Sequence, residues 1–390
     1  MFLAALCAAC THVEADYAAV DQADRPARLL HQDDLVYVGA FRLPAGGRDG
    51  ATFEYGGKAI AFNPGNNSLF ITGHDHHQLT AEIEIPDLVD STDYRKLPVA
   101  RFLQPLSDAT NGKLPEINPG DPNGQKVGGH LVYGDKLIVS AYSYYDGAGT
   151  QRGTHFVRPL SLSADGPVRG PLALGKRVHF TGGYMTEVPP EWRAALGGRA
   201  LTGNCCRAII SRQSHGPAIS SFDPGRLIEG DTDSVTDLLH YTSRHPLGPG
   251  ENTQNPYFNL TTKVEGVVFP HDTASILFFG YHGTGPYCYG SGEKCNDPAR
   301  RSQGTHAYPY VYQVWAYDAN DLASVKRRKK SPFRVLPYAV WTFNLPFEKD
   351  GAHYLGGAAY DPESDLIYIS QRNGKGPMPI IHAFRIKRQK

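Results

Sequence analysis

Short apolar segments alternate with turn sequences along the chain, and the same order recurs. The first unit has apolar runs at 59–62, 69–71 and 81–85, with a turn at 63–67 between the first two. The last unit, residues 357–384, repeats this order almost unchanged. Runs of this length separated by turn formers predict β-strands, and self-similarity at this scale predicts a repeat architecture. Three further units of the same kind begin near residues 130, 207 and 266.

A fourth β-like run precedes each unit, starting near residues 35, 97, 176, 238 and 338. Four strands per repeat around one axis is a β-propeller blade, which leaves only short, protected sheet edges. The sequence therefore predicts an all-β fold, a single β-propeller of four-stranded blades, of which we count five. The spacing of about 60 to 100 residues exceeds the usual ~40–50 per blade, so seven blades stay open, with degenerate ones near 104–125, 180–200 and 285–310.

Composition supports short strands joined by turns. The 390 residues include 42 Gly and 29 Pro, together about 18% of the chain, and 22 Tyr, while only 20% are charged. This excludes a helical bundle or a coiled coil. Helical signals are confined to short pieces at 189–196 and 319–327.

The charge balance limits the kinds of binding partner that the chain can have. The chain has 39 Lys and Arg against 39 Asp and Glu, so its formal charge is zero. A neutral chain argues against a nucleic-acid binder and against a binder of anionic membranes. After residue 10 no apolar run approaches the ~20 residues that a transmembrane helix needs.

The N-terminal residues resemble an export signal. Residues 1–10 are small and apolar up to Cys10, as in a signal or lipoprotein-like segment, and Cys10 is where a lipid anchor would attach. Residues 11–32 are expected to be a polar tether and residues 33–390 the β-propeller catalytic domain. We therefore expect a secreted, periplasmic or outer-surface lipoprotein.

The remaining cysteines allow two interpretations. In an exported protein, Cys288 and Cys295 can form a loop disulfide. Alternatively, they join His215 and His282 in a tetrahedral two-His, two-Cys zinc site. The adjacent Cys205 and Cys206 cannot both point into one core from a regular strand, because successive side chains alternate between faces.

Candidate chemistry lies in the loops that follow the second strand of each unit. In a propeller these loops gather on one face around the central funnel. They are rich in His, Tyr and Arg, and the inner strands add polar residues at their starts, including Glu265 and Arg207. The expected substrate-binding residues are Lys58, His74, His76, Tyr142, Tyr144, Arg212, Tyr281 and Arg372.

Two reaction types suit these residues. β-Elimination from a uronic acid needs a cation for the carboxylate, a base, and an acid for the leaving oxygen, and Arg, His and Tyr supply these roles. Glycoside hydrolysis needs two carboxylic acids instead, for which Asp75 and Glu265 are the candidates. A non-catalytic propeller that binds glycans or protein through its aromatic loops is the third hypothesis.

An ordered set of residues resembles the β-propeller polysaccharide lyases of the ulvan-lyase type. It comprises His130 opening an inner strand, His155, Tyr184 and Arg207. The resemblance implies a seven-bladed fold, a structural zinc at the two-His, two-Cys set, and elimination at a uronic acid of a sulfated polysaccharide. In that reading Arg207 neutralises the uronate, and Tyr184 or His130 is the base.

The leading hypothesis from the sequence is therefore an exported polysaccharide lyase acting on an anionic, uronic-acid-containing polysaccharide. Its alternatives are a propeller glycoside hydrolase that uses Glu265 and Asp75, and a binding propeller without turnover.

Overall fold

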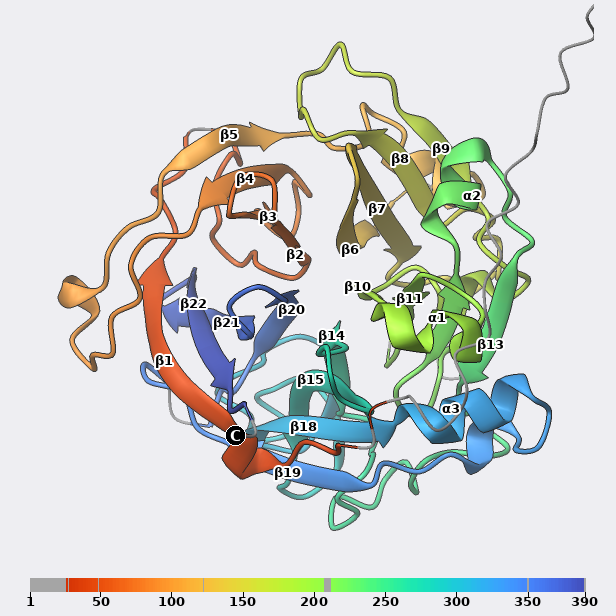
Figure 1. Ribbon diagram of the computed structural model, residues 1–390. Coiled ribbons are helices and arrows are strands. Elements are labelled where there is room, and N and C mark those ends of the chain that lie inside the picture. Colours follow the sequence, from red (N-terminus) through yellow and green to blue (C-terminus); the bar gives the residue numbers. More distant parts are fainter. Residues whose placement is uncertain are drawn as a thin grey trace, which may run out of the picture.

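The protein is a ring of five four-stranded antiparallel sheets, as the computed structural model shows (Figure 1). The structure describes residues 26, 28–47, 49–121, 123–206, 212–348 and 351–388. The prediction of an all-β propeller is confirmed, with five blades. The regions suspected of hiding extra blades hold a turn of 3₁₀-helix, the start of the third blade, and a two-stranded hairpin.

Each blade has its strands in chain order from the axis outward, except where the chain ends meet. Blade 1 is β2 (Ile60–Asn63), β3 (Ser68–Thr72), β4 (Thr80–Glu84) and β5 (Phe102–Ser107); blade 2 is β6 (Gln125–Tyr133), β7 (Lys136–Ser143), β8 (His155–Pro159) and β9 (Arg169–Leu172); blade 3 is β10 (Met185–Glu187), β11 (Ala200–Thr202), β12 (Ile219–Phe222) and β13 (Val235–Leu239). Blade 4 is β14 (Lys263–Val268), β15 (Ser275–Gly283), β18 (Tyr310–Asp318) and β19 (Ala339–Phe343); blade 5 is β20 (Leu355–Asp361), β21 (Leu366–Lys375), β22 (Met378–Ile386) and β1 (Leu35–Arg42).

The other elements are short and lie between strands. The hairpin of β16 (Cys288–Gly290) and β17 (Gly304–His306) is inserted in blade 4, and the helices are α1 (Pro190–Leu196), α2 (Pro224–Glu229) and α3 (Ala319–Lys326). The 3₁₀ turns are η2 (Gln32–Asp34), η3 (Tyr94–Lys96), η4 (Leu114–Ile117), η5 (Val178–Phe180) and η7 (Pro332–Arg334). The two predicted helices are confirmed as α1 and α3. None of the described helices is long and apolar enough to cross a bilayer.

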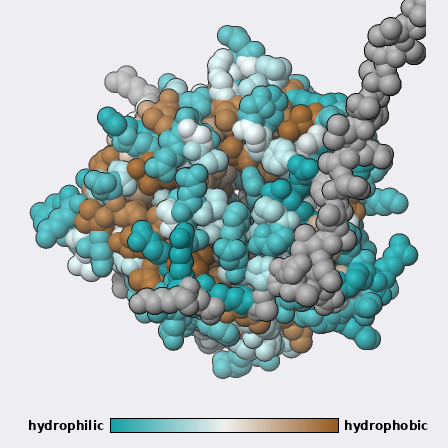
Figure 2. All heavy atoms as spheres, viewed as in Figure 1, coloured by the Kyte–Doolittle hydropathy of each residue, from teal (hydrophilic) through white to brown (hydrophobic). Residues whose placement is uncertain are grey.

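The core is divided among the five blade interfaces. One cluster of buried side chains fills each gap between neighbouring blades, such as Phe70 with Val127 between blades 1 and 2, and Trp315 with Ile219 between blades 3 and 4. Every residue of β15 is buried because both faces of this strand are covered by other blades. Figure 2 shows hydrophilic and hydrophobic residues interspersed over the face of the ring that is turned to the viewer.

The N-terminal strand closes the ring. β1 forms the outer edge of blade 5 by pairing with β22, with Leu35 opposite Ile386. The preceding residues are docked as well: Leu30 is fully buried, and its N–H donates to Ser275 Oγ at 2.7 Å. Arg28 also contacts the propeller, since its Nη2 donates to Asp34 Oδ1 at 3.0 Å. The division into tether and propeller domain at residue 32 stays a prediction. The predicted signal segment and residues 11–25 lie outside the described residues.

Blade 3 differs from the expectation. The sequence placed its inner strand at residue 207, but the inner strand is β10, and β11 is the second strand. Both have only three residues, too few to give a recognisable hydrophobic pattern. Residues 207–211, including Arg207, lie outside the described part of the chain.

Glycines let the inner strands begin close together. A Cβ on Gly356 would lie 1.8 Å from the carbonyl oxygen of Gly57, and one on Gly128 would lie 2.1 Å from that of Gly182. A Cβ on Gly266 would lie 2.5 Å from the backbone nitrogen of Ala358. We call Gly57, Gly128, Gly182, Gly266 and Gly356 the glycine collar. It brings backbone against backbone at three of the five blade interfaces.

We predict that Gly356→Ala destabilises the protein by about 2–4 kcal/mol, because the added methyl group meets rigid backbone and not a side chain that could move. Chemical denaturation measures the change. The matched control is Gly65→Ala, where the nearest atom is a side-chain oxygen at 3.4 Å, and we expect a change within about 0.5 kcal/mol. Equal stability of the two variants would show that the collar is not tightly packed.

Candidate active site

The topology collects the predicted binding loops at one end of the central axis. The inner strands begin at this end and the second strands finish there, so we call it the axial mouth. All the residues expected to bind substrate lie at this end of the chain's strands. Lys58 stands just before β2, and the others stand at the ends of second strands or in the loops beyond them: His74, His76, Tyr142, Tyr144, Arg212, Tyr281 and Arg372.

An ion cluster joins blades 1 and 2 at the axial mouth. Lys58 Nζ lies 2.7 Å from Asp75 Oδ1, and Lys126 Nζ lies 3.2 Å from Asp75 Oδ2. Lys126 also donates to the carbonyl oxygen of Asp75. The two lysine side chains are largely buried, so their contacts with the carboxylate are poorly screened by water.

Electrostatics extend this cluster to blades 4 and 5. Burial alone would raise the pKa of Asp75, but Lys58, Arg372 and Lys126 hold it well below its usual range. Burial lowers the pKa of Lys58, and Arg372 adds to that effect, whereas Asp75 and Glu265 oppose it. Asp75 is therefore ionised at neutral pH, and Lys58 lies within electrostatic reach of both carboxylates.

Arg372 is held across the closure between blades 5 and 1. It extends from β21, and its Nη2 donates to the carbonyl oxygen of Tyr55 at 2.7 Å while its Nε donates to that of Gly56 at 3.2 Å. Both acceptors lie in the loop before β2. The contacts fix the guanidinium beside the start of the first inner strand.

Glu265 lies at a bulge of the inner strand β14. Val264 pairs with Gly280 and Gly266 pairs with Phe279, so Glu265 is the extra residue. Bulges redirect side chains and are common beside active sites. Glu265 is buried, and its charge acts on both Lys58 and Tyr281.

Tyr281 contributes a phenol to the same region. Burial raises its pKa to about 12, which Arg300 and Arg372 oppose and Glu265 supports. Its ring packs edge-on against Tyr354 and Tyr310, with centroids 5.1 and 6.1 Å away. Tyr281 is therefore a protonated hydrogen-bond donor at neutral pH.

The two histidines of the expected catalytic set lie inside blade interfaces. His130 on β6 is 1% exposed, and its Nε2 lies 3.1 Å from Thr80 Oγ1 of blade 1. His155 on β8 is fully buried, with its Nε2 3.3 Å from Thr202 Oγ1 of blade 3. Burial lowers the pKa of each to about 3, so both are neutral.

Tyr184 also packs away from the mouth. Its hydroxyl donates to the carbonyl oxygen of Ala218 at 3.0 Å, and its ring packs edge-on against Phe278 of blade 4. His130, His155 and Tyr184 thus lie at three different blade interfaces and do not converge. Arg207, the fourth member of the set, lies outside the described residues. The five blades also depart from the seven that the resemblance implies.

The expected zinc ligands are arranged differently. Cys288 and Cys295 form a disulfide, the alternative that the sequence left open. The ring of His282 contacts Asn259 Nδ2 at 3.1 Å and Thr262 Oγ1 at 2.8 Å, and His215 packs against Phe258. Within the described ranges, no three His, Cys, Asp or Glu side chains form a group that could hold a metal ion. Zinc content itself stays a prediction.

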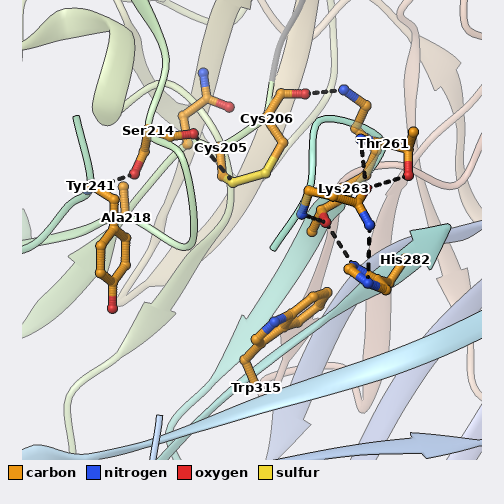
Figure 3. Close-up of a disulfide and its surroundings, with 12 residues drawn as sticks. Cys205, Cys206, Ser214, Ala218, Tyr241, Thr261, Lys263, His282 and Trp315 are labelled. Carbon is orange, nitrogen blue, oxygen red and sulfur yellow. Dashed lines mark hydrogen bonds between the residues drawn. A yellow bond between two sulfur atoms is a disulfide. The ribbon is translucent and has the colours of Figure 1, made fainter. Parts of the chain in front are cut away.

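Cys205 and Cys206 form a second disulfide, between neighbouring residues (Figure 3). Both are buried in the irregular segment after β11, and Cys206 has a left-handed φ of 66°. Because the segment is not a regular strand, the two neighbouring side chains do not alternate between faces, and their sulfur atoms can meet. Lys263 donates to the carbonyl oxygen of Cys206, which ties the segment to the start of β14 (Figure 3).

Lys126 was not among the residues that the sequence predicted for the site. It stands near the start of the second inner strand, as Lys58 stands before the first. This positional equivalence within the repeat was the available signal. Asp146, His179 and Arg300 were also missed, because their positions depend on irregular loops.

We predict that Asp75→Asn destabilises the protein by about 2 kcal/mol at neutral pH, because two buried lysines lose their counter-ion. The pKa of Asp75 is depressed in the folded state. Its contribution is therefore fully present above the unfolded pKa of ~3.9 and is lost as the pH falls toward the folded value. Thermal unfolding should show a difference from the wild type that is constant near neutrality and shrinks below about pH 4. A difference independent of pH would contradict this account.

We predict that a Cys7→Ser, Cys10→Ser double variant, unfolded without reductant, contains no titratable thiol, because the other four cysteines are paired. Thiol titration before and after reduction measures this, and elemental analysis of the folded protein measures zinc. Two free thiols together with bound zinc would restore the zinc hypothesis at Cys288 and Cys295.

No protein-family model matches the sequence, and no curated protein matches it. Among solved structures, a native arabinanase of Bacillus subtilis is similar, with 9% identity and a TM-score of 0.45 over 88% of this chain and 95% of that one. A protein of the GH130 family, whose glycoside hydrolases target β-1,2 mannosidic linkages in Candida mannan, has 11% identity and a TM-score of 0.44 over 94% and 98%. A luciferin-regenerating enzyme has 7% identity and a TM-score of 0.37 over 86% and 92%. At such identities these likenesses concern the fold alone.

Proposed function

We propose that the protein hydrolyses a glycosidic bond of a glycan bound at the axial mouth, with Asp75 and Glu265 as its carboxyl groups. The observation that carries the proposal is that Lys58 lies within electrostatic reach of both residues, although they come from blades 1 and 4. Glycoside hydrolysis needs two carboxyl groups beside the scissile bond.

The environment of Asp75 suggests its role, and the role of the acid is then assigned to the other carboxyl group. Lys58, Lys126 and Arg372 keep Asp75 ionised, which suits a nucleophile or a base that activates water. Glu265 then donates the proton to the leaving oxygen. The phenol of Tyr281, close enough to interact electrostatically with Glu265, can hydrogen-bond the sugar or the leaving group.

Exposed aromatic rings around the mouth support a glycan as the substrate. Tyr55 and Tyr289 are 50% and 61% exposed, and Tyr144 and Tyr145 are 47% and 62% exposed. All four belong to mouth-side loops or to the inserted hairpin. A phenol ring has an apolar face and a polar tip, a combination that suits the faces and hydroxyls of sugar rings.

A second candidate is β-elimination at a uronic acid, the reaction that leads the sequence-based hypotheses. The observation that favours it is the cation excess: Lys58, Lys126 and Arg372 accompany Asp75 and Glu265. In this version Arg372 neutralises the uronate and Tyr281 replaces the buried Tyr184 as the phenol. The substrate is then an anionic polysaccharide.

Export remains part of the proposal. The two disulfides are of the kind that persists in oxidising compartments, which supports a secreted, periplasmic or outer-surface protein.

We predict that Asp75→Asn and Glu265→Gln each reduce kcat by roughly 10²–10⁴-fold on the glycan that the wild type cleaves. The assay incubates the protein with neutral and acidic polysaccharides and follows reducing ends and the ultraviolet absorbance of unsaturated uronates in parallel. The matched controls are Asp87→Asn and Glu116→Gln, which change exposed carboxylates. Circular dichroism checks the folding of every variant.

The outcomes separate the candidates. Reducing ends without the chromophore, lost in both carboxyl variants, support hydrolysis. Reducing ends with the chromophore, lost in Tyr281→Phe and Arg372→Gln, replace hydrolysis by elimination. Unchanged turnover in folded Asp75→Asn and Glu265→Gln overturns the carboxyl pair. Glycan binding without any product identifies a binding propeller instead.

A further inference from the structure

A small polar cavity lies beside the axial mouth between blades 2 and 3, and we propose that it is a subsite for the oxyanion of an acidic sugar unit, either a carboxylate or a sulfate. This proposal rests on the proposed function, because it takes the substrate to be a glycan. The cavity volume is about 20 Å³, which admits one small group and not a sugar ring. The lining residues that the argument uses are Tyr144, Asp146, His179, Arg212 and Gln213.

Arg212 supplies the positive charge. Its Nε is buried and has no hydrogen-bond partner among the residues that the structure describes. The guanidinium lies on the bare backbone of the loop after β7, since a Cβ on Gly149 would be 1.9 Å from Arg212 Nη1. A guanidinium has five N–H donors in a planar fork and no acceptor, so a buried unpaired Nε is unfavourable unless a ligand supplies an acceptor.

Gln213 supplies the second unpaired atom. Its side chain is 7% exposed, and its Oε1 is buried without a partner in the described part of the chain. Neighbouring residues in one cavity thus leave a donor and an acceptor unpaired. A sugar unit that bears an oxyanion next to a hydroxyl complements both, because the oxyanion accepts from Arg212 and the hydroxyl donates to Gln213.

Asp146 does not take the place of this ligand. Its Oδ1 accepts from the backbone N–H of Thr150 at 2.9 Å, and its Oδ2 accepts from that of Gln151 at 3.2 Å. The carboxylate is therefore used by its own loop, and its charge offsets that of Arg212 without a hydrogen bond to it. This arrangement fixes the loop that carries Gly149 and so positions the guanidinium.

Two further residues complete the subsite. His179 Nε2 lies 3.7 Å from Asp146 Oδ2, so the ring is oriented beside the carboxylate at the cavity wall. Tyr144 is at the edge of the cavity and is exposed, where its ring can pack against the sugar that carries the oxyanion. The cavity therefore selects a charged substituent, while the mouth holds the glycan chain.

The test measures binding of single sugars by calorimetry, independently of turnover. The probes are glucuronate and galacturonate as carboxylates, glucose 6-sulfate as the sulfate, and glucose and galactose as neutral sugars. We expect Arg212→Gln to weaken binding of the acidic sugars by roughly 10- to 100-fold, the loss typical of a charge-assisted hydrogen bond. Arg212→Lys should recover only part of the affinity, because the planar fork is lost.

The matched control is Arg152→Gln, which removes the same charge from an exposed residue of the neighbouring loop after β7 and should leave binding unchanged. Preference for glucuronate and galacturonate identifies the oxyanion as a carboxylate, and preference for glucose 6-sulfate identifies it as a sulfate. Equal binding of neutral and acidic sugars, or an unchanged affinity in folded Arg212→Gln, overturns the subsite.

Failure of the subsite and failure of the proposed function are distinguishable. Asp75→Asn should reduce turnover as predicted above and keep the Arg212-dependent binding. Arg212-dependent binding in a protein that cleaves no glycan keeps the subsite and rejects the enzyme. Turnover with no binding preference for acidic sugars keeps the enzyme and rejects the subsite.

Discussion

The close approach of the inner strands is the constraint on which the site depends. With only five blades, the strands around the axis start almost in backbone contact, and the glycine collar makes this spacing sterically feasible. Backbone at this distance leaves room for few side chains, so those at the strand starts are forced together. Lys58 and Lys126 stand at the starts of the inner strands of blades 1 and 2 and meet on one carboxylate there.

The same constraint separates the groups that face the mouth from those that hold the blades together. Polar side chains beyond the strand starts, or on the outer strands, contact the neighbouring blade. An imidazole buried there is neutral and lies beside a hydroxyl group of that blade. His130 and Thr80 illustrate this arrangement. At the strand starts, burial is offset by opposite charges, so Asp75 stays ionised. Polar residues of these blades therefore either pair with a neighbouring blade, as His130 does, or lie in the charged cluster at the mouth, as Asp75 does.

The features that were predicted correctly from the sequence are those that a local hydrophobic pattern determines. Strands with long apolar runs, such as β15 and β21, were recognisable, and counting them gave five blades. The loops at the mouth followed from the topology. The inner strand of blade 3 did not, because β10 is too short to show a period. The roles of His155 and Tyr184 were unpredictable because a sequence does not show which interface a buried side chain faces.

The pairing of β1 with β22 has a consequence for biosynthesis. The two strands of this pair are separated by almost the entire chain. The sheet of blade 5 can therefore be completed only after β22, the last strand, has been synthesised. Until then β1 presents an unpaired edge, and Arg372 on β21 has not reached the carbonyl groups before β2. Arg372 is thus the last member of the charged cluster to be made, and a chain truncated between residues 344 and 371 would hold the strands of four blades but lack Arg372 at the mouth.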